Sequence, residues 1–321
     1  MRPELFEIPI IHLTVKSYGL MMVIGFLAAV YIIRRLSRDI TPDPQLITNA
    51  ALYSLIGGVF GARVFFVLHH LSDFKQNPVD VFKIWYGGLE LLGGVILAVA
   101  IIIFYLIYHK LPIRKYLDIL AIGLMLALAF GRIGCFLNGC CFGKPTDLPW
   151  AVRFPYNSFA YLSQINSNIE RKRTEPQLKL PQDDYIYFID KDNHWHPKPY
   201  EQLTEEQKVE VTTGKYRCLP VHPTQLYSSA IGAIFCVILY LFWKRSKKKG
   251  KFHAKPGSTF CLMFILYGIA RFFLELLRDD NPFEFDGLTI SQNISIIMII
   301  TGSILIVVFQ KTKTKPKTRK S

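Results

Sequence analysis

The chain has 321 residues, of which 51% are hydrophobic, and its formal net charge is +14. The apolar residues are not spread along the chain but gathered in runs of about 20, the length that crosses a bilayer. This distribution excludes an ordinary soluble domain. It predicts an all-α polytopic membrane protein, because an isolated span must satisfy its own backbone hydrogen bonds in lipid.

Seven runs predict transmembrane helices. They cover residues 18–36, 50–70, 88–109, 114–136, 221–243, 258–277 and 289–309. The first run lacks the short apolar core and small-residue cleavage site of a signal peptide, so we expect it to be retained.

The basic residues between the predicted spans indicate the orientation of the chain. The connections after the first, third and fifth spans and the tail carry nineteen Lys and Arg, against five in the short segments on the opposite side. The positive-inside rule therefore places the N-terminus outside and the C-terminus in the cytoplasm. We interpret residues 311–321 as a basic tail that contacts anionic membrane lipids, in preference to a nucleic-acid-binding arm.

One long polar insertion interrupts the apolar pattern. Residues 144–220 carry eleven Lys and Arg and eleven Asp and Glu, together with aromatic stretches such as "DDYIYFID". The aromatic content predicts a small folded extracytoplasmic lobe between a membrane part at 1–143 and another at 221–310. Within the lobe, His194 and His196 have no further ligands in their neighbourhood, so no metal site is predicted there.

Polar side chains inside the predicted spans mark candidate sites, because charged groups are costly in lipid. They are Arg63, Arg132, His222, Gln225, Tyr267, Arg271, Glu275 and Arg278. The last four are four, four and three residues apart, so they share one helix face and predict ion pairs from Glu275 to Arg271 and Arg278. The arginines outnumber the glutamate. This surplus favours a phospholipid head group as the counter-ion, since a guanidinium binds phosphate through two hydrogen bonds.

Five motifs occur in one order over the seven spans. They read "SYGLMMVIGF", "GRIGCFLNGCCFG", "HPTQLYSS", "YGIARFFLELLRDD" and "LTISQNISI". Together they resemble the prolipoprotein diacylglyceryl transferases of bacteria, over essentially the whole chain except residues 144–220. The resemblance implies a multi-pass inner-membrane enzyme that transfers the diacylglyceryl group of phosphatidylglycerol to the lipobox cysteine thiol of a prolipoprotein. Glycerol phosphate would be released, and no cofactor is implied.

The resemblance also implies functional residues. Those matching the family signature are Gly131, Arg132, Gly134, Phe136, Asn138 and Gly143. Arg132 corresponds to the arginine that binds the lipid phosphate, and Arg271 to the second essential arginine. The expected catalytic residues are Arg132, Arg271, Tyr267 and His222. The expected substrate-binding residues are Arg132, Tyr18, Gly19, Arg63, Asn138, Gln225, Glu275 and Arg278.

The chain departs from the family pattern at four positions. Cys135 replaces the signature asparagine, Cys140 the glutamate, Leu92 a histidine and Ser228 an acidic residue. Because the nucleophile is the substrate's own cysteine, the enzyme must help a thiol with a pKa of about 8.5 to lose its proton. We expect His222 to be the base, since histidine titrates near neutrality. Glu275 is the alternative base, and a packing role ahead of Pro223 is the other interpretation of His222.

Three cysteines lie together in "GRIGCFLNGCCFG". We interpret Cys135, Cys140 and Cys141 mainly as replacements that reshape this loop. A disulfide from Cys135 to Cys140, or from the loop to Cys218, is the next interpretation on an oxidising outer face. No metal is predicted, because a fourth ligand is not apparent in the sequence.

Two alternatives of other classes stay open. One is a non-catalytic phospholipid-binding membrane paralogue, or one with altered specificity. The other is a thiol–disulfide redox membrane protein that uses Cys140 and Cys141. The arginines at family positions favour the transferase over both.

Overall fold

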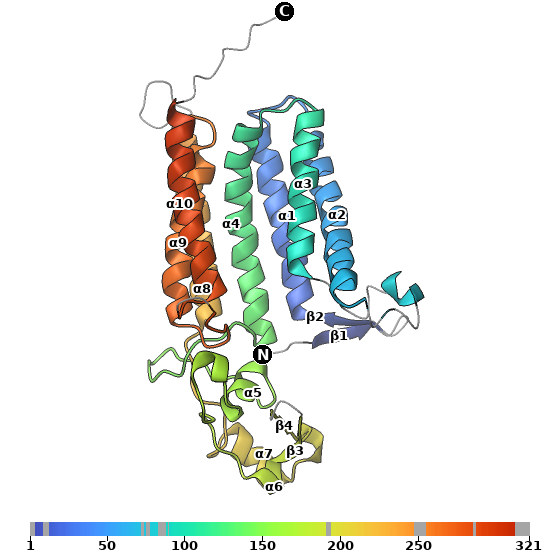
Figure 1. Cartoon of the computed structure of the whole chain (residues 1–321), viewed down its shortest axis with the longest axis vertical. Coiled ribbons are helices and arrows are strands. Elements are labelled where there is room, and N and C mark those ends of the chain that lie inside the picture. Colours follow the sequence, from blue (N-terminus) through green and yellow to red (C-terminus); the bar gives the residue numbers. More distant parts are fainter. Residues whose placement is uncertain are drawn as a thin grey trace, which may run out of the picture.

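The computed structural model describes residues 4–8, 13–71, 74, 78–82, 88, 90–190, 194–246, 255–284 and 287–311. Figure 1 shows a bundle of long, nearly parallel helices with a smaller lobe at one end. The predicted basic tail, apart from Lys311, lies outside the described residues, as does most of the basic connection after the fifth span.

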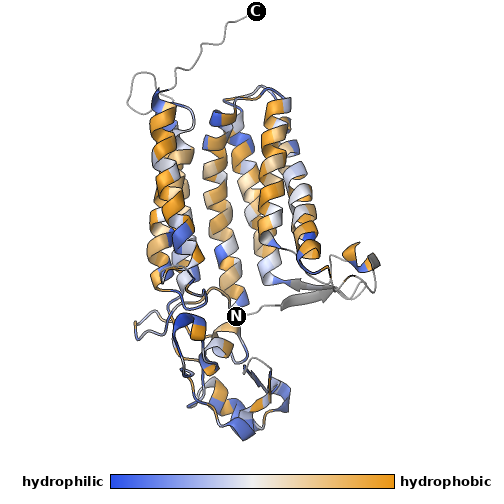
Figure 2. Cartoon of the chain, viewed as in Figure 1, coloured by the Kyte–Doolittle hydropathy of each residue, from blue (hydrophilic) through white to orange (hydrophobic). Residues whose placement is uncertain are grey.

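Seven long helices correspond to the seven predicted spans. They are α1 (Ser17–Ser37), α2 (Gln45–His69), α3 (Leu91–Tyr108), α4 (Ile113–Asn138), α8 (Thr224–Ser246), α9 (Ser258–Leu276) and α10 (Ile290–Lys311). Six of them are long and apolar enough to cross a membrane, and the stretch Leu92–Tyr108 of α3 is apolar but shorter. Figure 2 shows apolar residues along the helices and polar residues at their ends and on the lobe. The prediction of an all-α polytopic membrane protein is confirmed.

Helix α4 is the centre of the bundle. It packs against α1, α3, α8 and α9, while α2 pairs with α3 and α10 with α9. The α2–α3 contact depends on small residues: a Cβ atom on Gly61 would lie 2.5 Å from the carbonyl oxygen of Gly93, and one on Gly93 would lie 2.5 Å from that of Gly61. Glycine at both positions therefore lets the two backbones touch.

A buried carboxylate fixes α9 against α4. Asp118, on α4, accepts hydrogen bonds from the backbone N–H groups of Gly257 at 2.7 Å and Phe260 at 3.0 Å. These N–H groups belong to the first turn of α9, where no intrahelical acceptor exists and where the helix dipole favours negative charge. Asp118 thus caps a neighbouring helix rather than its own.

The lobe has its own core and a mixture of short elements. They are α5 (Phe159–Ile165), α6 (Gln182–Tyr185), β3 (Ile186–Ile189), β4 (Trp195–Pro197) and α7 (Glu205–Thr212), with β3 and β4 antiparallel. Its interior is built around Tyr161, which is fully buried. Helix α7 begins at a capping box in which the Thr204 side chain and the Gln207 side chain each accept a hydrogen bond from the other's backbone N–H.

A second pair of strands precedes α1, which the sequence analysis did not predict. Strands β1 (Glu4–Ile8) and β2 (Leu13–Lys16) are antiparallel, and β2 runs directly into α1. In Figure 1 this hairpin and the lobe lie at the same end of the bundle. The connections from α1 to α2 and from α3 to α4, and the end of α10, lie at the opposite end. This alternation agrees with the charge bias of the connections, and which end faces the cytoplasm stays a prediction.

Candidate functional site

The site begins where α4 ends. Gly139 has φ of 78°, in the left-handed region that favours glycine. Its N–H donates to the carbonyl of Phe136, and the N–H of Cys140 donates to the carbonyl of Cys135, both at 3.2 Å. This pair of bonds is a Schellman motif, which satisfies the last carbonyls of the helix and turns the chain back over it.

Backbone hydrogen bonds hold the segment after this turn between two other parts of the chain. Gly143 donates to the carbonyl of His222 and His222 donates to the carbonyl of Lys144, both at 3.1 Å. Lys144 in turn donates to the carbonyl of Leu277 at 2.8 Å. The start of α8, the end of α4 and the end of α9 are therefore joined at one place.

Two side chains at the start of α8 fix the cysteine loop. Thr224 Oγ1 donates to the carbonyl of Cys141 and Gln225 Nε2 donates to the carbonyl of Cys140, both at 2.7 Å. Both side chains are 1% exposed, so these bonds are shielded from water. Gln225, expected to bind substrate, is thus occupied in holding the loop.

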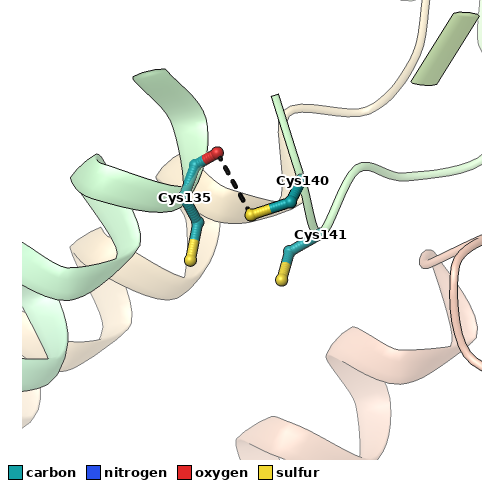
Figure 3. Close-up of side chains that lie close together, drawn as sticks. All are labelled: Cys135, Cys140 and Cys141. Atoms are coloured by element: carbon teal, nitrogen blue, oxygen red, sulfur yellow. Dashed lines mark hydrogen bonds between the residues drawn. The ribbon is translucent and has the colours of Figure 1, made fainter. Parts of the chain in front are cut away.

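The three thiols converge. The Sγ atoms of Cys135, Cys140 and Cys141 all lie within 4.8 Å of one another, and all three cysteines are free (Figure 3). Hydrogen bonds from the Cys135 and Cys140 thiols, helped by the positive charges of Arg278 and Arg132, hold the pKa of Cys141 well below its ordinary value.

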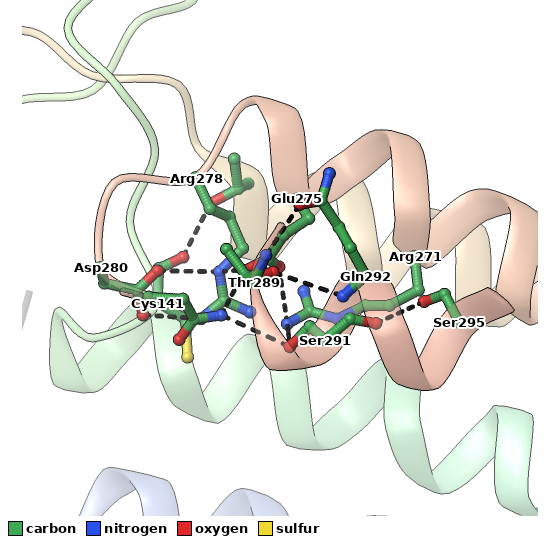
Figure 4. A network of polar contacts seen from close by, with 11 residues as sticks. Cys141, Arg271, Glu275, Arg278, Asp280, Thr289, Ser291, Gln292 and Ser295 are labelled. Carbon is green, nitrogen blue, oxygen red and sulfur yellow. Dashed lines mark hydrogen bonds and ion pairs between the residues drawn. The ribbon is translucent and has the colours of Figure 1, made fainter. Parts of the chain in front are cut away.

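The predicted ion pair on α9 is present. The Nη2 atom of Arg271 lies 2.8 Å from Glu275 Oε2 and also donates to Ser291 Oγ at 2.8 Å. Asn281 donates to the other oxygen of Glu275. The Nη1 atom of Arg271 is buried and has no hydrogen-bond partner in the described part of the chain. Figure 4 shows this network at the junction of α9 and α10.

The charge balance of the cluster differs from the one expected. Arg278 donates from Nε to Asp280 Oδ1 at 2.8 Å and from Nη2 to Asp280 Oδ2 at 2.6 Å. Its Nε lies 3.8 Å from Glu275, a weaker contact. Asp280 lies beyond the end of α9, so the residue spacing along a helix face could not predict this ion pair. The predicted surplus of charge is therefore smaller, because Arg278 is already neutralised.

Arg132 supplies the remaining positive charge. It projects from the last turns of α4, is only partly buried, and has neither a hydrogen bond nor an ion pair among the described residues. It lies near enough to Tyr267, Cys141 and Arg278 to interact with them electrostatically. The positive charges of Arg132 and Arg271 also lie near enough to repel each other. The structure thus brings Arg132, Arg271 and Tyr267 together, and their catalytic role stays a prediction.

Helix α1 provides one side of the same region. Tyr18 interacts electrostatically with Arg132 and the three cysteines. Its Cα lies 3.3 Å from the position that a Cβ on Gly134 would take, so glycine allows α1 to approach α4. Gly19 has open space around it. Asn138, at the end of α4, lies beside Cys140.

Arg63 lies apart from this cluster. Its guanidinium donates to the carbonyls of Val81 at 2.8 Å, Gly88 at 3.0 Å and Asp80 at 2.6 Å. It also lies over the ring of Phe66. These contacts brace the segment between α2 and α3, a role that sequence position within a span does not reveal.

His222 is fixed through its backbone, and its Nδ1 is buried without a partner in the described residues. The ring packs against the ring of Tyr227 in a T-shaped arrangement, with 6.2 Å between the ring centroids. No hydrogen bond between the ring and the cysteines or arginines occurs among the residues that the structure describes.

The lobe lies at the same end of the bundle as the site (Figure 1). A cavity of about 650 Å³ lies at the junction, and Cys140, Cys141 and Asp280 line it together with lobe residues. Arg173 of the lobe donates to Asp279 at 2.7 Å, which ties the lobe to the end of α9. Arg171, in the short 3-10 turn Ile169–Arg171, is 9% exposed, and its Nε and Nη2 atoms have no partner in the described part of the chain. Neither arginine was predicted from the sequence, because nothing in the polar insertion distinguishes them from surface charges.

Together these features define a multi-pass membrane protein with a cluster of arginines at one end of its bundle. Residues 3–308 match the family model for prolipoprotein diacylglyceryl transferase. The chain belongs to this family, and it is therefore a transferase.

Curated relatives agree over nearly the whole length. The chain is 30% identical over 302 residues to a phosphatidylglycerol–prolipoprotein diacylglyceryl transferase of Clostridium tetani, covering 94% of this chain and 95% of the relative. A protein of the same name from Burkholderia cenocepacia is 30% identical over 307 residues, or 92% and 90% of the two chains. One from Synechococcus elongatus is 26% identical over 300 residues, or 94% and 84%.

Proposed function

We propose that the chain transfers the diacylglyceryl group of phosphatidylglycerol to the lipobox cysteine of prolipoproteins in the bacterial inner membrane. The family and the names of its relatives support this proposal. The observation that carries it is the state of two arginines. Arg132 has no ion pair among the described residues, and the buried Nη1 of Arg271 has no acceptor there.

The reaction needs positive charge where the leaving phosphate forms. The lipobox thiolate attacks the carbon that joins the diacylglyceryl group to the phosphate. The bond from this carbon to the phosphate oxygen breaks, and glycerol phosphate departs with the electron pair. Negative charge on the phosphate grows during this step. Preorganised guanidinium groups stabilise it because they face the growing charge without reorganising in water. Arg132 and Arg271 serve this role in the proposal.

The other residues position these two. Glu275 holds Arg271 through the 2.8 Å ion pair and leaves Nη1 directed elsewhere. Arg278, neutralised by Asp280, orders the end of α9 rather than binding phosphate. Tyr267 lies near both Arg132 and Arg271, where its hydroxyl can donate to a phosphate oxygen.

The acceptor peptide enters from the lobe side. Residues 144–220 cover the outer end of the bundle as an extracytoplasmic lobe, and the cavity at the junction gives a polypeptide room beside the cysteine loop. The lipid substrate arrives from the membrane beside Gly19 of α1, where there is open space, and its head group lies near Tyr18 and Asn138. His222 stays the proposed base, since its unpartnered Nδ1 can accept a proton.

The test measures transfer by the purified protein in phosphatidylglycerol proteoliposomes, with a lipobox peptide as acceptor. Arg132→Ala and Arg271→Ala should each abolish transfer, and lysine at either position should rescue it poorly because it lacks the bidentate fork. Arg114→Ala is the matched control, since Arg114 lies at the opposite end of α4, over the ring of Phe309 at 4.3 Å. Near-normal transfer by both site variants would refute the proposal.

A further inference from the structure

The convergence of three thiols needs an explanation of its own. Cys135 belongs to α4, whereas Cys140 and Cys141 follow the glycine turn, and their Sγ atoms nevertheless lie within 4.8 Å of one another. The described contacts do little to hold the sulfur atoms: Cys140 Sγ lies 3.7 Å from the carbonyl of Cys135, a weak hydrogen bond. The sequence alone favoured the interpretation of these cysteines as replacements that reshape the loop, because it does not show that their sulfur atoms converge.

The backbone around the sulfur atoms is strongly fixed. Cys140 and Cys141 are each held by a buried side chain of α8, at 2.7 Å. Cys141 has φ of 61°, a left-handed conformation that a non-glycine residue adopts at a cost. The backbone positions that carry the three thiols are therefore preorganised, while the side chains keep some freedom to rotate.

The geometry is close to that of a zinc site. Zinc binds thiolates at about 2.3 Å, so two ligands of a tetrahedral site lie about 3.8 Å apart. The three sulfur atoms lie within 4.8 Å of one another, which is at most about 1 Å more than that spacing. Catalytic zinc sites use three protein ligands and keep the fourth position open, so the lack of a fourth protein ligand does not argue against such a site.

The surrounding charges suit the resulting complex. Three thiolates and one Zn²⁺ carry a net charge of about −1, since each ligand must lose its proton on binding. Arg278 and Arg132 both lie close enough to interact with Cys141. His194 and His196 line the same cavity, but their rings face Asp190 at 3.5 and 3.1 Å, so they are not part of the sulfur cluster.

We propose that Cys135, Cys140 and Cys141 bind one zinc ion whose fourth position receives the lipobox thiol. This proposal rests on the proposed function. Cys140 and Cys141 line the cavity at the lobe junction, so the open position faces the space through which the peptide enters. A metal-bound thiol is deprotonated outright, which supplies the thiolate near neutral pH.

The step balances without a further reactant. The lipobox S–H gives its proton to the proposed base, His222, when its sulfur binds the ion. The sulfur then forms a bond to the glycerol carbon, the carbon–oxygen bond to phosphate breaks, and the phosphate takes the electron pair. The thioether is a weaker ligand than the thiolate, so the product leaves the ion. No oxidant or reductant takes part.

The first experiment measures metal directly. The purified, reduced protein should hold one zinc ion per chain, and cobalt substitution should produce thiolate-to-cobalt charge-transfer absorption. The Cys135→Ser/Cys140→Ser/Cys141→Ser variant should lose both signals, whereas the control Cys218→Ala/Cys236→Ala should keep them. In the unaltered protein the three thiols should resist alkylation until a chelator is added, a result that does not depend on the folding of any variant.

The second experiment adds the acceptor. A lipobox peptide should change the spectrum of the cobalt protein, and the same peptide with serine in place of cysteine should not. Chelation should lower transfer by about 100-fold or more, the scale of a general-base contribution, and zinc should restore it. A protein that binds metal with this spectral response but transfers no diacylglyceryl group would refute the proposed function and leave the site intact.

Three results would overturn the zinc site itself. They are the absence of bound zinc in a reduced and active protein, a disulfide between two of the three cysteines in the active protein, and full transfer by the triple serine variant. The last is the outcome that the replacement interpretation predicts.

Discussion

Asp280 accepts two hydrogen bonds from the guanidinium of Arg278, at 2.8 and 2.6 Å, just beyond the end of α9. The pair is nearly closed to solvent, with side-chain exposures of 5% for Arg278 and 20% for Asp280. It neutralises one of the three arginines that gather near the cysteine loop. In the proposed function, the lipid phosphate is therefore bound by Arg132 and Arg271, because Arg278 is already paired with Asp280.

Replacing this acceptor should destabilise the protein. We expect Asp280→Asn to lower the free energy of unfolding by about 1.5–3 kcal/mol, the range for hydrogen bonds to a charged group. Thermal unfolding in detergent measures it. Glu175→Gln is the matched control, because the Glu175–Lys179 pair is 73% exposed on both sides and should matter little. Equal unfolding temperatures for Asp280→Asn and the unaltered protein would contradict the structural role of the pair.

The sequence predicted this part of the site incompletely for a physical reason. Periodicity predicts contacts along a helix, so it correctly paired Arg271 with Glu275. Asp280 lies after the helix has ended, where chain direction depends on loop conformation. Arg63 shows the same limit, because its acceptors are backbone carbonyls 17 to 25 residues further along the chain.

Gly143 should tolerate no side chain. A Cβ there would lie 2.6 Å from the Cβ of His222 and 2.9 Å from the carbonyl oxygen of Leu277, so the three joined segments would have to separate. We expect Gly143→Ala to cost about 1–3 kcal/mol and to lower transfer at least tenfold. Gly58→Ala is the control, since its Cβ would meet its nearest neighbours at 3.5 Å. Comparable activity of the two variants would show that this junction of α4, α8 and α9 does not position the site.

The junction of α4, α8 and α9 also shows which features of the site can be predicted from the sequence. The turn at Gly139 follows from glycine chemistry, and the seven spans follow from apolar runs and their length. The convergence of Cys135, Cys140 and Cys141 depends on Thr224 and Gln225, which lie more than 80 residues away in the chain. Long-range contacts of this kind leave no local pattern.

Cys218 should be chemically inert in the folded lobe at neutral pH. Burial raises its pKa to about 11, and the residue is only 2% exposed. At pH 8 the thiolate fraction is then about one in a thousand, so iodoacetamide should modify Cys218 only after unfolding. The thiol loses its proton at a lower pH in the unfolded protein than in the folded protein. The free energy of unfolding should therefore fall as the pH rises from about 9 towards 11. Rapid labelling of Cys218 at pH 8 in the folded protein, followed by mass spectrometry, would contradict its burial.

The orientation of the chain can be decided with two exposed positions at opposite ends of the bundle. Lys179 lies on the lobe and Arg38 follows α1 at the other end. The positive-inside rule predicts that Lys179→Cys reacts with a membrane-impermeant maleimide in spheroplasts, whereas Arg38→Cys reacts only after the membrane is permeabilised. Native cysteines on the lobe side also react with the maleimide and give the same background in every variant. The quantity measured is therefore the label mass of each variant beyond that of the unaltered protein. The reverse pattern would place the cysteine loop and the lobe in the cytoplasm, where a prolipoprotein could not reach them after export.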